Sequence, residues 1–216
     1  YRHDQFGEDV MNRNIQKTTG RVGIRRAEPG EYDALGQLTV AAYEQLTGMP
    51  GRDEQPGYYA LLRDVEGRAN TPATEIWVAV SEQGGLLGGV TYIDNVIHYG
   101  AGGSVSTVPD AAGFRLLAVA PAARRQGVGR SLTVKCIERA RESGRKKLVL
   151  HTTQSMKTAW EMYLGMGFKR FPAIDFEQGR LKVYGFYMDI APVSPAHPET
   201  PADREAHGRQ PVRRPG

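Results

Sequence analysis

The chain has 216 residues, a formal net charge of +4 and a single cysteine, Cys136. This length suffices for one domain with a full hydrophobic core, and one cysteine excludes an internal disulfide and fits a reducing compartment. The sequence contains no apolar run of about 18 residues and no signal peptide, so we expect a cytoplasmic protein without a membrane span.

The positive charge lies at the two ends. Residues 1–26 hold six basic and three acidic residues, 191–216 hold four and three, and 27–190 is neutral. A basic character that comes from the ends gives little support to a nucleic-acid surface. We expect a flexible segment at 1–20, whose first ten residues are either an expression remnant or an upstream extension. One domain at 21–190 and a disordered, Pro-rich basic tail at 191–216 complete the chain.

The N-terminal half predicts strands and helices in turn. A short strand is expected at 22–26, followed by a helix at 31–46 with apolar residues at helical spacing and a second helix at 58–65. The period then changes, and 75–81 and 86–97 predict a β-hairpin.

The C-terminal half continues this alternation around a long Gly/Ser loop at 98–111. The order of elements predicts one α/β domain with a mixed central sheet of about six to seven strands, flanked by about four helices. The expected elements are a strand at 114–120, a helix at 128–142, a strand at 147–152, a helix at 156–164, a strand at 168–171, a turn at 177–179 and a strand at 181–190.

A turn with two glycines joins the central strand to the helix after it. Gly127 and Gly129 allow a tight turn and a close approach of the backbone to a ligand. The free N–H groups and the positive dipole end of a helix attract phosphate oxygens. Arg124, Arg125 and Arg130 flank this point and can add charge-assisted hydrogen bonds. The turn therefore predicts a pyrophosphate site.

The motif narrows the class of phosphate ligand. A Walker loop is absent, and a dinucleotide fingerprint would need a third glycine where Leu132 stands. The stretch Arg124–Gly129 has the pattern Arg-x-x-Gly-x-Gly and resembles the acetyl-CoA pyrophosphate motif of the GNAT superfamily. It follows Leu117–Pro121, which resembles the strand before that motif. Ala159–Phe168 is similar to the family's later helix, with a tyrosine shortly before a Gly-Phe pair, and the resemblance covers about 22–190.

The resemblance implies a GNAT-like fold and an acetyl-CoA-dependent N-acetyltransferase that moves the acetyl group directly to an amine in a ternary complex, without a metal. The Leu117 backbone amide would stabilise the oxyanion, and Tyr163 would protonate the departing thiolate. The implied cofactor-binding residues are Leu117, Val119, Arg124, Arg125, Gln126, Gly127, Val128, Gly129 and Arg130.

The implied role of Tyr163 as the acid requires an unfavourable proton transfer. A free phenol has a pKa of about 10 and a thiol about 8.5, so the proton transfer is uphill unless the site shifts one of them. The alternative is a core aromatic, because Met156, Ala159, Tyr163 and Met166 form a helical stripe.

The sequence does not single out a general base. Gly113 and Phe114 offer no carboxylate on the central strand, and Asp94, Asp110, His98 or a chain of waters stay open. Two other polar groups have structural interpretations. Cys136 is expected to be a buried helix residue and His151 a satisfied strand-end residue. The five histidines lack metal-ligand spacing.

Alternatives remain for both activity and acceptor. The chain could bind acyl-CoA without catalysis or transfer a longer acyl group, and a nucleic-acid module using 124–147 is a further alternative. The family's acceptor specificity implies roles for 43–70 and 98–112, where Glu44, Asp53, Glu54 and Asp64 could attract a cationic amine. Separately, Tyr58, Tyr59, Tyr92 and Tyr99 could line an acceptor cleft or be packing groups. The acceptor is a small amine, an aminoglycoside-like polyamine, or a protein N-terminus or lysine. Neither a membrane nor nucleic acid is an expected partner, and a homodimer is left open.

Overall fold

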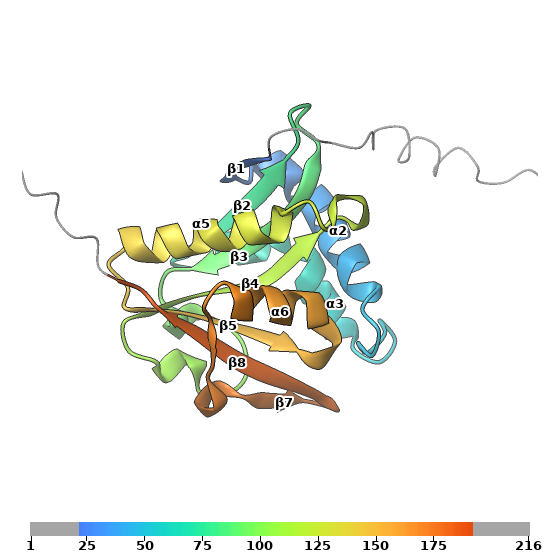
Figure 1. Ribbon diagram of the computed structural model, residues 1–216. Helices are drawn as coiled ribbons and strands as arrows, with labels where there is room; N and C mark the ends of the chain where they lie inside the picture. Colours follow the sequence, from blue (N-terminus) through green and yellow to red (C-terminus); the bar gives the residue numbers. More distant parts are fainter. Residues whose placement is uncertain (1–21, 192–216) are drawn as a thin grey trace, which may run out of the picture.

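The computed structural model describes residues 22–191 (Figure 1). The segment predicted at 1–20 and the predicted tail after residue 191 lie outside these residues. The strands are β1 Gly23–Arg26, β2 Thr74–Val80, β3 Leu86–Ile93, β4 Ala111–Val119, β5 Lys147–Thr153, β6 Lys169–Arg170, β7 Phe176–Gln178 and β8 Leu181–Asp189. The α-helices are α2 Tyr32–Glu44, α3 Pro56–Arg63, α4 Val65–Ala69, α5 Val128–Glu142 and α6 Lys157–Gly165.

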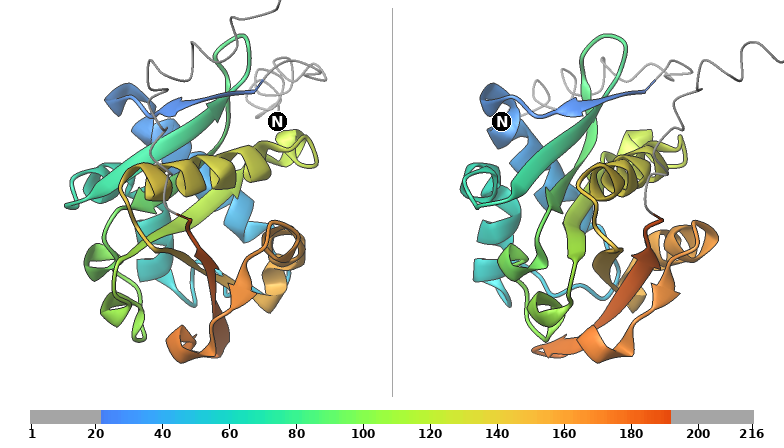
Figure 2. Two further views of the ribbon diagram at one scale, coloured as in Figure 1. Left: turned by 60° about the vertical axis from the view of Figure 1, so that its left-hand side comes forward. Right: turned by 90° about the vertical axis from the view of Figure 1, so that its left-hand side faces the viewer.

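All eight strands belong to one mixed sheet. Its order is β1-β2-β3-β4-β5-β8-β6, and β7 pairs with β8 outside this path. Only β4 and β5 run parallel to each other; the other pairs are antiparallel. The predicted mixed α/β sheet is confirmed, and β7 is the strand that was predicted as part of a turn. Helix α5 covers one face and α2 the other, which the right-hand view of Figure 2 shows with α5 nearly end-on.

Two predicted elements end differently in the structure. Strand β3 stops at Ile93, four residues early, because the Asn95 side chain accepts the N–H of Ile97 and starts a 3-10 turn. The second predicted helix divides into α3 and α4 at Asp64, whose ψ of 78° is not helical and whose carboxylate accepts the N–H of Gly67. The side-chain caps thus override the apolar pattern.

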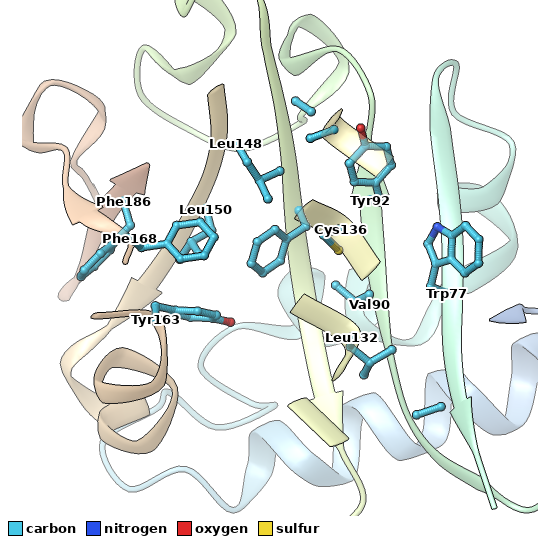
Figure 3. Packing of buried hydrophobic residues seen from close by; sticks show 14 of the residues in the cluster. Trp77, Val90, Tyr92, Leu132, Cys136, Leu148, Leu150, Tyr163, Phe168 and Phe186 are labelled. Carbon is cyan, nitrogen blue, oxygen red and sulfur yellow. The ribbon is translucent and has the colours of Figure 1, made fainter. Parts of the chain in front are cut away.

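The largest hydrophobic cluster lies between the sheet and helices α5 and α6 (Figure 3). Cys136 is fully buried in it, which confirms the interpretation from sequence, and burial raises the pKa of its thiol. A second cluster packs α2 and α3 against the end of β4 through Tyr43, Tyr59, Leu62 and Leu116. The end of β4 therefore has a packed layer on both faces.

The contact between α2 and α3 depends on Gly36. A Cβ at this position would lie 2.3 Å from the carbonyl oxygen of Arg63, which is main chain and cannot rotate away. We expect Gly36→Ala to lower the free energy of unfolding by about 2 kcal/mol, measured by urea denaturation, because the helices must move apart.

Gly57→Ala in α3 is the matched control, because a Cβ there would have no neighbour within 4 Å. This substitution should leave stability unchanged or raise it by about 0.5 kcal/mol, since alanine favours helix. Equal losses for the two variants would show that the close contact at Gly36 is not the cause.

Candidate functional site

Strands β4 and β5 separate at the centre of the sheet. Their pairing runs only from Ala111 opposite Lys147 to Phe114 opposite Leu150. Beyond it, residues 115–119 of β4 have no pairing with β5 among the described residues, and the arrowheads of the two strands point apart (Figure 1). We call residues 115–119 and 151–153 the splayed edges. Main-chain groups on these edges are available to a ligand that enters between them.

A β-bulge shapes the splayed edge of β4. The register with β3 passes from Gly89 opposite Ala118 to Thr91 opposite Arg115, so β4 holds one extra residue. Leu116 lies in the bulge and has a left-handed φ of 54°, a strained conformation for a residue with a side chain. The N–H of Ala120 donates to β3. By strand alternation, the N–H groups of residues 117 and 119 turn toward the β5 side.

The turn before α5 presents a row of free N–H groups. Gly127 is the N-cap of α5 with a φ of 80°, and Arg125 is also left-handed with a φ of 63°. Within residues 22–191, no hydrogen bond engages the main-chain N–H groups of 125–130, and Ser131 is the first to donate, to the Gly127 carbonyl at 2.9 Å. Six consecutive donors at a helix N-terminus form a phosphate-binding geometry.

The positive charge around α5 gathers at this same end. Five of the nine basic residues between 124 and 147 form ion pairs with carboxylates in the described structure. Of the other four, three flank the turn, which favours a compact phosphate ligand there over an extended nucleic-acid surface. The five pairs are Lys135–Glu138, Arg139–Glu75, Arg145–Asp94, Lys146–Asp110 and Lys147–Asp189.

Three elements converge at Gly129. A Cβ added there would lie 3.6 Å from both the Leu117 and Val119 side chains and 3.7 Å from Met162 of α6. The structure therefore brings together the two strand residues and the turn that the sequence grouped as one site. Met162 was missed by the sequence analysis, because it lies outside the predicted stripe of Met156, Ala159, Tyr163 and Met166 and matches no motif.

Tyr163 lies in the core beside the splayed edges. Its side chain is 4% exposed, with its ring edge-to-face against Phe114 at 5.8 Å and Phe168 at 5.7 Å. Figure 3 shows its hydroxyl directed away from Phe186 and toward the middle of the cluster. Burial raises the pKa of this phenol well above 10, and Cys136 adds a smaller increase. The hydroxyl is therefore protonated at neutral pH.

Two buried hydroxyls on the splayed edge of β5 have no hydrogen-bond partner. These are the Oγ1 atoms of Thr152 and Thr153, residues that are 2% and 4% exposed. Thr152 shares a face with Leu150, on the side of α5 and α6, and Thr153 shares the opposite face with His151. A buried hydroxyl without a partner is costly, so each group is available to hydrogen-bond a ligand on its own face of the sheet. Neither threonine belongs to a motif, so sequence analysis could not have identified them.

The candidate bases lie away from the splayed edges or are engaged elsewhere. Asp94 is ion-paired with Arg145 at 2.5 Å, Asp110 with Lys146 at 2.7 Å, and His98 is exposed in the loop after β3. Asp94 and Asp110 flank the paired ends of β3 and β4, opposite to the bulge. None of these side chains is placed to accept a proton at residue 117.

His151 has both ring nitrogens in contact with polar atoms. Its Nε2 lies 2.9 Å from the Ile174 carbonyl and its Nδ1 lies 3.4 Å from the Tyr99 hydroxyl. Burial lowers its pKa, so the ring is neutral, donating from Nε2 to the carbonyl. The interpretation as a satisfied strand residue is confirmed.

The acidic residues expected to attract an amine are mostly engaged in structural contacts. Glu44 is ion-paired with Arg52, Glu54 with Arg180 at 3.1 Å, and Asp64 caps α4. Of the four candidate tyrosines, Tyr92 lies on the α5 face and donates to Asp94, so it does not belong with the others.

The described residues contain neither a membrane-spanning helix nor a metal-binding cluster. Between residues 22 and 191, no helix combines the length and apolar character needed to cross a bilayer. The same residues contain no group of three His, Cys, Asp or Glu side chains that could hold a metal ion.

Comparison with known proteins shows similarity to one family. The model of the acetyltransferase (GNAT) family matches residues 38–168. A search of curated proteins found no match. Among solved structures, a GNAT-family acetyltransferase from Staphylococcus aureus Mu50 is 16% identical with a TM-score of 0.59, covering 79% of this chain and 100% of its own.

Two other solved structures contain ligands. A putative acetyltransferase from Salmonella typhimurium, determined with its cofactor acetyl-CoA, is 17% identical with a TM-score of 0.56 and covers 82% of this chain and 98% of its own. A spermidine N-acetyltransferase from Vibrio cholerae, in complex with CoA and spermine, is 20% identical with a TM-score of 0.52 and covers 78% and 95%. At these identities the likeness concerns the fold.

Proposed function

Because the chain belongs to the acetyltransferase (GNAT) family, it is an acetyltransferase, and we propose that it transfers the acetyl group of acetyl-CoA directly to an amine. The observation that carries this proposal is the row of six free N–H groups at 125–130, next to the splayed edge of β4. The row fits a pyrophosphate, and the unpaired strand edge fits the amides of a pantetheine arm.

The proposed reaction forms one bond and breaks one. The neutral amine nitrogen attacks the thioester carbonyl carbon, the new C–N bond forms, and the C–S bond breaks. The amine gives up a proton to water, and the leaving sulfur takes one up to become the free thiol. In this proposal both substrates are bound together, and Cys136 is not an acyl-enzyme nucleophile, because it is fully buried and burial raises the pKa of its thiol.

We assign two roles to residues of this chain. The N–H of Leu117, turned toward the β5 side by the bulge, is the donor for the developing oxyanion. Tyr163 is the acid for the leaving sulfur, since its phenol stays protonated throughout the neutral range. Leu117, Val119 and 124–130 form the proposed acetyl-CoA site. The Salmonella neighbour, whose structure holds acetyl-CoA, supports acetyl-CoA as the ligand.

Calorimetric titration with acetyl-CoA tests the proposed site. We expect saturable binding by the wild-type protein and at least about tenfold weaker binding by an Arg124→Ala/Gly127→Trp double variant. Gly127 has a φ of 80°, so a tryptophan there both strains the turn and covers the free N–H groups.

The opposite end of α5 offers a matched control. Arg141→Ala/Gly144→Trp removes the same charge and places the same bulk at another left-handed glycine, with a φ of 67° and no neighbour within 4 Å. This variant should bind acetyl-CoA like the wild type. Equal binding by all three proteins would place the ligand elsewhere, and no binding by the wild type would refute the proposed function.

A further inference from the structure

The face of β4 opposite Tyr163 carries two arginines without a carboxylate partner. Arg115 precedes the bulge on β4, and Arg68 of α4 reaches the same region beneath β3. No carboxylate oxygen of the described residues lies within ion-pair distance of either guanidinium. We call Arg68 and Arg115 the arginine pair.

Only some of the hydrogen-bond donors of the Arg115 guanidinium have an acceptor. Its Nη1 donates to the carbonyl oxygens of Tyr99 at 2.8 Å and Gly100 at 2.6 Å, and the guanidinium lies 5.6 Å from the centre of the Tyr99 ring. Both hydrogens on Nη1 are thus used. The Nε and Nη2 atoms donate to no acceptor in the described structure, and this edge has the fork geometry that binds a carboxylate with two parallel hydrogen bonds.

Arg68 is 8% exposed and donates only to neutral groups. Its acceptors are the Thr91 hydroxyl at 3.2 Å and the main-chain carbonyls of Leu61 and Leu62. Burial and, as a smaller cause, the positive charge of Arg115 together lower its pKa to about 10, while the carboxylate of Asp64 opposes this shift. Thr91, which accepts from Arg68, lies opposite Arg115 in the register of β3 and β4. The two guanidiniums are therefore neighbours that repel each other, and an anion bound at Arg115 would relieve this repulsion.

The side chains that surround Arg115 are aromatic rather than acidic. Tyr58 stacks edge-to-face on Tyr43 at 6.2 Å, and both rings lie within the electrostatic range of Arg115. Tyr99 lies under the guanidinium and its hydroxyl donates to the Phe114 carbonyl at 3.1 Å. A region with two cations and tyrosine walls disfavours a polycation and favours a small molecule with an anionic group.

We propose that the acceptor is an amine that also carries a carboxylate, an amino-acid-like molecule whose carboxylate binds the free edge of Arg115. This inference rests on the proposed acetyl transfer and names its substrate class. Arg115 lies two residues before Leu117, whose amide is the proposed oxyanion donor. When the carboxylate of the acceptor binds Arg115, its amine, a few bonds from the carboxylate, is held near the thioester carbonyl. The spermine bound by the Vibrio cholerae protein represents the opposite class of acceptor.

The first test compares acceptors on the wild-type protein. Release of free CoA thiol is followed with a panel of amino acids, the carboxamide of each, and spermidine. We expect at least one amino acid to exceed its own carboxamide by about tenfold or more in kcat/KM, because the carboxamide lacks the charge. Preference for spermidine overturns the proposal. So does turnover of carboxamides equal to that of the acids, or no turnover of any acid while acetyl-CoA still binds.

The second test is Arg115→Gln. Its KM for the preferred acid should rise about tenfold or more, and the ratio of acid to carboxamide should fall toward one, with acetyl-CoA affinity unchanged. Arg141→Gln, on the exposed far end of α5, is the control that removes a charge without this effect. An unchanged ratio in Arg115→Gln contradicts the proposal. Calorimetry with acetyl-CoA tests the proposed function separately. A failure of the proposed function can therefore be distinguished from a failure of the proposed acceptor class.

Discussion

Replacing Tyr163 by phenylalanine is expected to lower kcat by about 10²-fold while the affinity for acetyl-CoA stays unchanged. Phenylalanine keeps the edge-to-face contacts with Phe114 and Phe168, so the core is preserved and only the hydroxyl is lost. Steady-state kinetics with an accepted amine and calorimetry with acetyl-CoA measure the two quantities.

The pH dependence gives this prediction a second readout. Burial raises the pKa of Tyr163 well above 10. The phenol therefore keeps its proton up to pH 10 and loses it only at higher pH. Loss of the acid should therefore not limit kcat in the wild type between pH 7 and 9. The raised pKa also makes complete proton transfer to a free thiolate more uphill, so the proton must move as the C–S bond breaks.

Tyr184→Phe on β8 is the matched control. Tyr184 also stacks edge-to-face, on Trp160 at 5.3 Å, and its hydroxyl forms no hydrogen bond within the described residues. It should retain wild-type kcat. If Tyr163→Phe is as active as Tyr184→Phe, Tyr163 is a packing residue and the leaving thiolate is protonated by solvent.

The second large effect is expected for Phe114→Ala, which should lower the free energy of unfolding by about 3–5 kcal/mol. Phe114 is 1% exposed and contacts Tyr163 and Phe168 at the last paired residue before β4 and β5 separate. A cavity there removes core contacts and also leaves the Tyr163 ring free to turn. Urea denaturation measures the loss, provided that the m-value is unchanged.

Phe114→Leu separates the two consequences. It retains most of the volume and should cost less than about 1.5 kcal/mol. A loss below about 1 kcal/mol for Phe114→Ala would mean that the core collapses around the missing ring, against the packing described above.

The arginine pair also bears on the missing base. Neither Gly113 nor Phe114 supplies a carboxylate on the central strand, and Asp94 and Asp110 are ion-paired. Like charges disfavour a protonated amine, so the guanidiniums should lower the pKa of a bound ammonium group and raise the fraction that is neutral. The carboxylate of the proposed acceptor would offset their charge for binding, and water could then take the proton.

The sequence by itself determined most of the elements and the turn before α5, at which we propose phosphate binding. Both are local: apolar periodicity sets strands and helices, and Gly127 with its neighbours needs only the strand before and the helix after to form a helix N-terminus. Even the burial of Cys136 follows from its place on one helix stripe. The assignment of individual site residues stays a prediction until ligand binding is measured.

Only the tertiary structure decided what faces the acceptor. Arg68 and Arg115 are 47 positions apart, and neither forms an ion pair in the described residues, whereas Glu44 and Glu54 pair with other arginines. The unpartnered hydroxyls of the β5 edge are likewise invisible in sequence. Charge balance and hydrogen-bond satisfaction are sums over all neighbours in space, so neither can be read from the spacing of residues along one chain segment.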